Sequence, residues 1–289
     1  MPASAQVTSL GIRVLPVLQA GTGRIVAVFQ RSIYLHSVAG LCCIGNASLP
    51  QGPLNAITTL DHFSQLTTTG NLWRFVSNCI WINAATVINT ANTRHWSSRA
   101  LSSNYPDANN LRLAASIIEQ ALWQSSQPNS SAIAAAVNAR INHSEQHLSM
   151  WLTSNTATDP DFIADLLGCG DGLTPAGDDL LLGAVVTLRH FHAGHAASLL
   201  ANSIKRLAAT KTNLISQAHL SVACDGQANE LLMNLLHACA EPTQLNLQPR
   251  IDQLLRYGHS SGHYTLRGVQ VALTSIARST STSSKSEIS

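Results

Sequence analysis

Residues Gly168-Cys-Gly-Asp-Gly-Leu-Thr-Pro-Ala-Gly-Asp-Asp179 lead directly into the apolar run Leu180-Leu-Leu-Gly-Ala-Val-Val-Thr-Leu188. The first part combines glycines with three carboxylates, and the second part is apolar on nearly every side of a helix. Such a helix is expected to be central and buried. Thr174 is placed to act as the N-cap, with Pro175 at the first helical position, where a missing N–H is harmless. The stretch therefore predicts a glycine-rich turn that opens a core helix.

The turn has the features of an anion site. Glycines let backbone N–H groups approach a ligand closely, and a helix N-terminus carries a partial positive charge. The carboxylates of Asp171, Asp178 and Asp179 would repel a phosphate unless a divalent cation lay between them. Two plainer interpretations stay open, because the helix dipole alone favours acidic residues in a first turn and glycine-rich loops are common connectors. The segment is neither a Walker loop nor a dinucleotide-binding fingerprint.

The composition of the whole chain narrows the class of protein. Its 289 residues are enough for one large domain or two, and 45% of them are hydrophobic while only 11% are charged. A surface so poor in charge indicates that other subunits cover part of it. The net charge of +2 gives no case for nucleic acid. We expect no membrane span and no signal peptide, and six cysteines without a CxxC pair favour reduced thiols in a cytoplasmic protein.

The patterning predicts an α+β protein. Residues 1–105 contain short β-branched and aromatic runs between glycine turns, which is typical of a small β-barrel or sandwich-like domain. These runs are Arg24–Phe29, Ser32–His36, Leu41–Ile44, Leu72–Val76 and Cys79–Ile82. Residues 106–278 have helical periodicity and form a mainly α-helical domain that carries the glycine- and aspartate-rich site, with one helix expected at about 250–257. The serine-rich residues 279–289 are expected to be disordered.

Two helix starts resemble each other. Thr174-Pro-Ala-Gly177 is followed six residues later by Gly183, and His259-Ser-Ser-Gly262 is followed six residues later by Gly268. Internal glycines let two helices approach closely. Our hypothesis is that the helices pack at these two glycines and bring both N-termini to one pocket. A chance match of small residues is the alternative.

Three further groups are assigned to structure rather than chemistry. His143 and His147 lie one helical turn apart without a third metal ligand, so a solvated helix face is favoured. The histidines at the next predicted helix end suit its negative dipole end, so we interpret them as capping residues. They are His190, His192 and His195. Cys169 lies between two glycines, and a tight fit is favoured over a nucleophilic role.

The string Gly170–Asp179 with Leu182-Gly183, together with Gly258-His-Ser-Ser-Gly262, resembles one protein family. This is the AllH-like family, formerly a domain of unknown function, which includes the third subunit of the oxamate carbamoyltransferase of anaerobic allantoin use. The β-rich start, Gly52-Pro53 and the order of segments are also similar, so the resemblance covers most of the chain. The sequence departs from the family pattern at Ala176, where Ser is usual, and at His263-Tyr264, where a Trp-Asp pair is expected.

The resemblance implies a subunit of a carbamoyltransferase complex that converts oxalurate and phosphate to oxamate and carbamoyl phosphate, or carries out a related carbamoyl transfer, with Mg²⁺ as the metal. It implies partner subunits and a small anionic substrate. The net charge and the lack of a long apolar stretch predict neither a nucleic-acid nor a membrane partner. We assign catalysis to Asp171, Asp178 and Asp179, and metal binding to Asp178 and Asp179. We assign substrate binding to Gly170, Gly172, Thr174, Gly177, Ser260, Ser261 and Gly262. The alternatives are a non-catalytic assembly subunit and a metal-dependent hydrolase of a phosphorylated small molecule.

Overall fold

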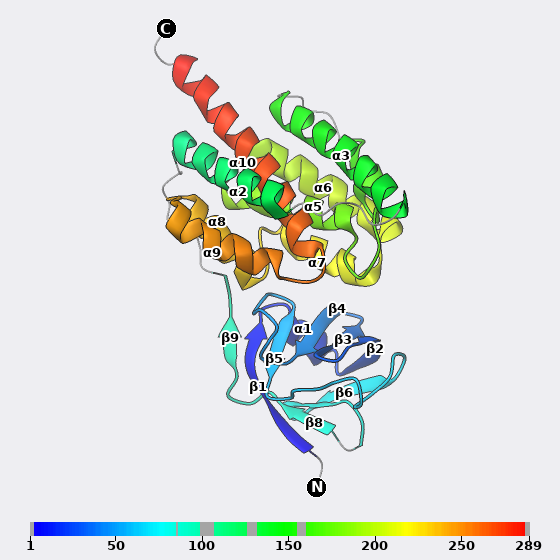
Figure 1. The fold of residues 1–289 in the computed structure, drawn as a ribbon. Helices are drawn as coiled ribbons and strands as arrows, with labels where there is room; N and C mark the ends of the chain where they lie inside the picture. The colour runs from blue at the N-terminus through cyan, green and yellow to red at the C-terminus, as the bar shows by residue number, and fades with distance from the viewer. Residues whose placement is uncertain (1–2, 85, 99–106, 126–131, 155–159, 287–289) are drawn as a thin grey trace. The chain divides into compact units, whose positions relative to one another are not determined.

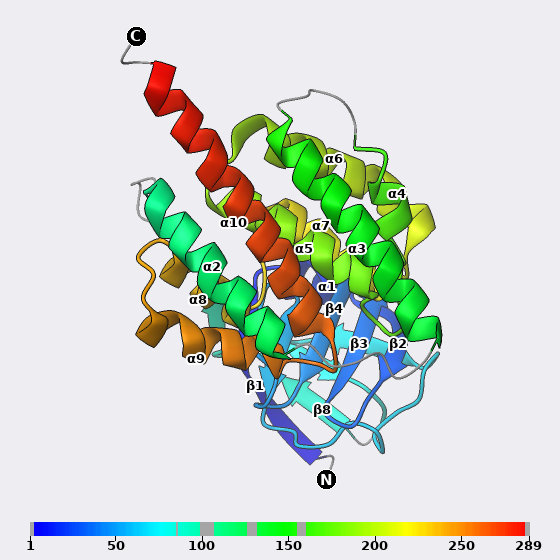
Figure 2. The same cartoon turned by 45° about the horizontal axis from the view of Figure 1, so that its top comes forward.

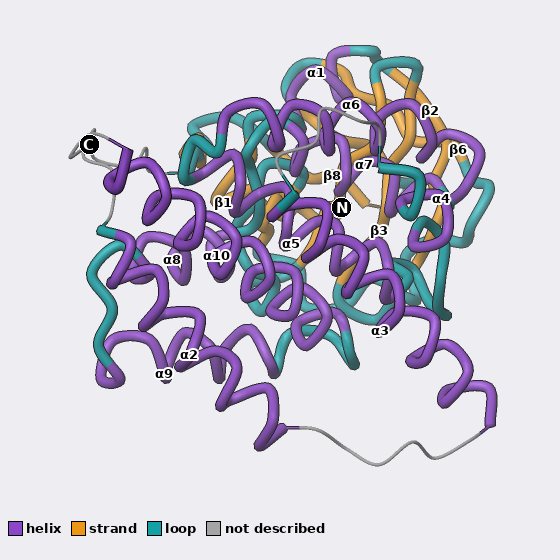
Figure 3. Tube along the Cα trace, turned by 90° about the horizontal axis from the view of Figure 1, so that it is seen from above, coloured by secondary structure: helices purple, strands orange, loops and turns teal. Residues whose placement is uncertain are grey.

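The computed structural model describes residues 3–84, 86–98, 107–125, 132–154 and 160–286 (Figure 1). The chain divides into two compact units, residues 1–99 and residues 100–289. The strands all belong to the first unit, and the described helices other than the short α1 (Val14–Gln19) belong to the second (Figure 3). The expected α+β class, with a β-rich unit followed by a helical one, is confirmed.

The first unit is a closed β-barrel. Its strands are β1 (Ala3–Gly11), β2 (Thr22–Val28), β3 (Ser32–Ser37), β4 (Gly40–Gly45), β5 (Asn55–Thr58), β6 (Leu72–Val76), β7 (Cys79–Trp81), β8 (Thr86–Asn89) and β9 (Arg94–Trp96). They follow the order β5-β4-β3-β2-β6-β7-β8-β1-β9, and β5 also pairs with β1, which closes the barrel over β1 to β8. β1 runs parallel to β8, and β4 runs parallel to β5. Of the two expected architectures, barrel and sandwich, the structure has the barrel.

Alternating side chains fill the barrel. In β6, the Trp73 side chain is fully buried while its neighbour Leu72 is 57% exposed. This period of two is what places one face of each strand in the core. Each of the five runs expected to be strands overlaps an observed strand, although Phe29 and Ile82 lie just beyond β2 and β7. Strands β1, β5, β8 and β9 were not among the expected runs.

The second unit is built around helix α5. Its helices are α2 (Ala108–Ser125), α3 (Ala132–Thr153), α4 (Ile163–Leu166), α5 (Ala176–His190), α6 (Gly194–Lys211), α7 (Leu214–Cys224), α8 (Glu230–Cys239), α9 (Gln244–Leu255) and α10 (Ser261–Ser286). α5 is buried along nearly its whole length, as its apolar sequence predicts. α10 packs most extensively against α5 and runs between α2 and α3 (Figure 2).

Three boundaries differ from expectation. The N-cap of α5 is Pro175 rather than Thr174, and no side chain caps this helix. α9 starts at Gln244 rather than near 250, because Thr243 and Asn246 form a capping box ahead of Pro249. α10 continues through Ser286, into the stretch that was expected to be disordered, and residues 287–289 lie outside the described residues. Among the described residues, the helices are too short or too polar for any of them to span a bilayer.

Candidate functional site

Helices α5 and α10 touch backbone to backbone. A Cβ atom on Gly183 would lie 2.1 Å from the carbonyl oxygen of Thr265, and one on Gly268 would lie 2.0 Å from that of Leu180. Real side chains do not tolerate such distances, so both positions require glycine. The expectation that these two helices pack at Gly183 and Gly268 is confirmed.

The same packing brings the two helix N-termini together. The Thr174 hydroxyl oxygen lies 2.8 Å from that of Ser261, which is the first residue of α10. Thr174 also donates a hydrogen bond of 3.2 Å to Oδ2 of Asp179, in the first turn of α5. A carboxyl and two hydroxyls from segments 87 residues apart therefore form one polar junction. We call these residues, Thr174, Asp179 and Ser261, the α5–α10 junction.

Asp179 lies on the inner side of the junction. Asp179 is only 5% exposed, whereas Thr174 and Ser261 are half-buried. Burial raises the pKa of the Asp179 carboxyl well above its usual value, the hydroxyls of Ser261 and Thr174 lower it in part, and the nearby Asp178 raises it further. A carboxyl with a raised pKa holds its proton at a pH where an exposed aspartate has lost it.

Asp178 points into a different environment. Its Oδ1 accepts a hydrogen bond of 2.8 Å from the N–H of Gly168, and its Oδ2 accepts hydrogen bonds from the hydroxyls of Thr212 and Ser216, the latter at 2.6 Å. Burial raises the pKa of Asp178, and these three donors oppose the rise. Asp178 is 1% exposed. Through these hydrogen bonds its carboxyl joins the glycine-rich turn to the start of α7. This geometry gives Asp178 a structural role, and it offers no support for the catalytic role assigned from the sequence.

The glycines of the turn fall into two groups. Gly170 and Gly172 have positive φ angles of 116° and 96°, which favour glycine. Gly177 is a packing residue, because a Cβ there would lie 2.1 Å from the carbonyl oxygen of Leu166. Its N–H donates to the carbonyl oxygen of Cys169 at 2.9 Å and is not directed at a ligand. Of the proposed anion contacts in the turn, Gly172 is exposed and Gly170 is half-buried, whereas Gly177 is buried.

The remaining assigned residues differ in their exposure. Asp171 is exposed in the turn, and Ser260 is exposed just before α10. Gly262 is buried against the end of α9, where a Cβ would lie 1.7 Å from the carbonyl oxygen of Leu254. The structure therefore unites Thr174, Asp179 and Ser261 and assigns packing to Gly262.

Sequence reasoning missed a polar contact between α10 and α3. The Tyr264 hydroxyl donates to Oδ1 of Asn138, and the guanidinium of Arg267 forms an ion pair with Glu145. Arg267 also lies over the ring of Tyr264, at 5.6 Å from the ring centroid. The signal in the sequence was the spacing of Ser261, Tyr264 and Arg267, which recur every three residues on one side of a helix. The partners of Tyr264 and Arg267 lie more than 120 residues earlier, and no local pattern indicates them.

The oxygen ligands near the N-terminus of α5 do not match a magnesium site. Mg²⁺ requires several oxygen ligands in octahedral geometry. Both carboxylate oxygens of Asp178 are directed at hydrogen-bond donors, and within the described part of the chain His, Cys, Asp and Glu side chains form no group of three or more that could hold a metal ion. The side chains present at Asp178 and Asp179 therefore do not fit a Mg²⁺ site.

Fold and site together define an α+β protein whose helical unit presents hydroxyls and a buried carboxyl where two helix N-termini meet. Residues 166–273 match the model of the family described as oxamate carbamoyltransferase subunit AllH. The matched segment extends from the end of α4 into α10 and contains the whole α5–α10 junction. It confirms the resemblance to the AllH-like family over this part of the helical unit. No curated protein and no solved structure matches the chain.

Proposed function

We propose that this chain is a subunit of a carbamoyltransferase complex and that it binds a small anionic substrate at the α5–α10 junction. The reaction is the conversion of oxalurate and phosphate to oxamate and carbamoyl phosphate, or a related carbamoyl transfer. The family match supports the kind of complex, and it includes every residue of the junction. The partners are the other subunits of that complex, and the chain acts in the cytoplasm.

The observation that carries the proposal is the contact of the buried Asp179 carboxyl with the Thr174 hydroxyl, which in turn meets Ser261. An ionised carboxylate draws both hydroxyl hydrogens inward. A protonated carboxyl instead donates its own hydrogen to a hydroxyl and leaves one hydroxyl hydrogen free to point outward. Because burial raises the pKa of Asp179, its protonated form persists to a higher pH than that of an exposed aspartate, and in that form the junction can donate to an anion.

The residues of the junction then have different roles. Thr174 and Ser261, which are half-buried, contact the substrate, while Asp179 is a positioning residue behind them. Ser260 precedes Ser261, and the turn with Gly170 and Gly172 precedes Thr174, so these residues add further substrate contacts at the edge of the junction. Two helix N-termini of long helices contribute partial positive charge in the same place.

This arrangement suits carbamoyl transfer. The carbamoyl carbonyl oxygen gains negative charge as a nucleophile adds to its carbon, and hydroxyl donors held in place stabilise that charge. Phosphate forms a bond to the carbamoyl carbon, the bond from that carbon to the oxamate nitrogen breaks, and the departing nitrogen takes up a proton. The group that supplies this proton is assigned to a partner subunit.

A non-catalytic assembly role is the second candidate. It is favoured by Asp178 and Gly177, whose polar groups are used within the chain to hold the glycine-rich turn against neighbouring segments. A turn held this way is suited to present a fixed surface to another subunit. No contact at the junction specifically favours the metal-dependent hydrolase.

The test is phosphate-dependent cleavage of oxalurate by the complex co-purified from the cell. We expect Ser261→Ala to lower turnover roughly 10²-fold, as the loss of one oxyanion donor does elsewhere. The matched control is Ser221→Ala, an exposed serine on α7. Turnover is compared only if the partner subunits still co-purify with each variant. Full turnover by Ser261→Ala in an intact complex contradicts the binding role, and loss of the partners from that variant instead supports the assembly role.

A further inference from the structure

Two histidines at the opposite end of α5 each have one ring nitrogen, Nε2, that is buried without a hydrogen-bond partner among the described residues. His190 is the last residue of α5 and is 7% exposed, and His237 lies in the last turn of α8. Their rings meet edge to face with centroids 5.0 Å apart. The Nε2 atoms of both rings are buried and have no hydrogen-bond partner among the described residues. Buried ring nitrogens normally have one, so this pair requires an explanation.

The tautomer of His237 is fixed by the backbone. Its Nδ1 lies 2.7 Å from the carbonyl oxygen of Met233, one turn earlier in α8. A carbonyl oxygen only accepts, so Nδ1 carries the hydrogen. In the neutral ring Nε2 is then an unprotonated acceptor, which is buried and has no partner among the described residues. Histidines that ligate metals have this arrangement, with the second nitrogen donating to a carbonyl or carboxylate.

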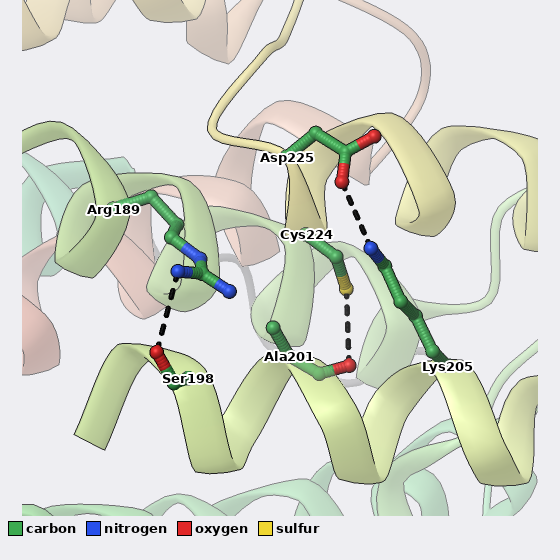
Figure 4. A network of polar contacts seen from close by, with 6 residues as sticks. All are labelled: Arg189, Ser198, Ala201, Lys205, Cys224 and Asp225. Atoms are coloured by element: carbon green, nitrogen blue, oxygen red, sulfur yellow. Dashed lines mark hydrogen bonds and ion pairs between the residues drawn. The ribbon is translucent and has the colours of Figure 1, made fainter. Parts of the chain in front are cut away.

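The C-terminal ends of two helices lie at this position. His190 and His237 each lie at the C-terminal end of a helix, of 15 and 10 residues respectively. Helix C-termini carry partial negative charge. The neighbouring cation Arg189 is turned away toward α6, where its Nη1 donates to the hydroxyl of Ser198 at 3.4 Å (Figure 4). The positive charge nearest in sequence is thus directed to another element.

We propose that His190 and His237 form a site for a divalent transition-metal ion of the Zn²⁺ or Co²⁺ type, with Nε2 of each ring as a ligand. Imidazole nitrogen is a preferred ligand of these ions, and water completes the coordination. The ion links the C-terminal ends of α5 and α8. His190 lies 11 residues beyond Asp179, about 16 Å along the helix axis. The ion is therefore separate from the α5–α10 junction, and this inference does not depend on the carbamoyltransferase proposal.

The test must first remove a competing surface pair. The rings of His143 and His147 lie 4.2 Å apart on α3, and His143 is exposed. The background protein is therefore the full chain with His143→Ala and His147→Ala. We expect calorimetric titration of this background with Zn²⁺ to show one bound ion per chain, and Co²⁺ to give the visible absorption of a nitrogen-ligated ion.

His190→Leu and His237→Leu, each made in that background, are expected to weaken Zn²⁺ binding at least tenfold. His195→Ala, an exposed histidine at the start of α6, is the matched control and should bind as the background does. Circular dichroism without metal checks that the variants fold. Ring ¹⁵N spectra of the background provide a measurement without the leucine variants, because addition of Zn²⁺ should shift the Nε2 resonances of His190 and His237. A background protein that binds no ion, or whose bound ion leaves these resonances unchanged, overturns the site.

Discussion

Asp178 and Asp179 are adjacent in sequence, but their carboxyl groups form hydrogen bonds with different parts of the structure. Neighbouring residues of an α-helix point about 100° apart, so the two carboxyls leave α5 on different sides. Asp178 meets three donors from Gly168, Thr212 and Ser216. Asp179 meets the Thr174 hydroxyl beside Ser261. One carboxyl therefore holds the turn in place, and the other contacts the hydroxyls of the α5–α10 junction.

The first prediction concerns the structural carboxyl. Asp178→Ala removes the acceptor of three donors, and each buried donor left without a partner costs about 1–3 kcal/mol. We expect the free energy of unfolding to fall by at least that amount in urea titrations. Asp171→Ala is the control, since Asp171 is exposed in the same turn, and it should change stability by no more than about 0.5 kcal/mol. Equal effects of the two substitutions would contradict the structural role of Asp178.

The second prediction concerns the stability of the Asp179 variant. The pKa of Asp179 is raised on folding, so the folded chain binds a proton more readily than the unfolded chain. The stability this supplies is present at low pH and is lost as the pH rises from about 3.9, the unfolded value, through the folded pKa. Asp179→Asn removes this dependence. We expect the variant to gain stability relative to the parent as the pH rises from 4 to 8, measured by urea unfolding. Asp171→Asn should show no such trend.

The third prediction concerns ligand binding at the same carboxyl. If protonated Asp179 frees a hydroxyl hydrogen for an anion, an anion should bind more tightly at lower pH. Oxamate is a suitable probe because it keeps one negative charge across the range from pH 5 to 8. In calorimetry with the complex, we expect its affinity to fall as the pH rises and to become nearly independent of pH in Asp179→Asn. An unchanged pH profile in that variant would show that another group controls binding.

At the scale of elements, the crossing of α5 and α10 decides where the junction forms. Two glycines permit backbone contact at the crossing, and the Thr174 and Ser261 hydroxyls lie beyond it toward the N-termini. The repeated spacing from a polar turn to an internal glycine was enough to predict this pairing. The start of α9 was not predictable from periodicity, because its capping box lies ahead of an internal proline.

The fourth prediction concerns this crossing. Gly268→Ala places a Cβ 2.0 Å from the carbonyl oxygen of Leu180, and backbone on the opposing helix cannot move aside as a flexible side chain does. We expect a loss of at least about 1–3 kcal/mol in the free energy of unfolding, the usual cost of overpacking, together with lower turnover of the complex. Gln270→Ala, two residues further along α10 and half-buried, is the control. A stability loss no larger than that of the control would contradict the close contact.

At the scale of the whole molecule, each unit has its own hydrophobic core. The barrel core contains Ile33 and Trp73, and the helical core contains Leu180 and Val185. Since the two sets of core residues do not overlap, each unit has a separate source of stability. The family match lies entirely within the helical unit.

The fifth prediction follows from the separate cores. Ile33 and Leu180 are both fully buried, one in each core. Truncation of such a side chain to alanine costs about 2–5 kcal/mol. We expect Ile33→Ala to increase hydrogen exchange in the barrel strands and to leave α5 protected, and Leu180→Ala to have the reverse effect, as measured by mass spectrometry. Equal loss of protection in both units from either variant would show that they unfold together.

The sequence by itself determined the order of a β-rich and a helical unit, the buried character of α5 and the pairing of α5 with α10. These properties follow from periodicity and from glycines, which are local features of a chain. Tertiary structure decided which carboxyl is structural, because the partners of Asp178 lie 34 and 38 residues away at Thr212 and Ser216. It also decided that Thr174 meets Ser261 instead of capping its own helix. A side chain's hydrogen bonds, and with them its pKa, depend on neighbours that only packing brings together.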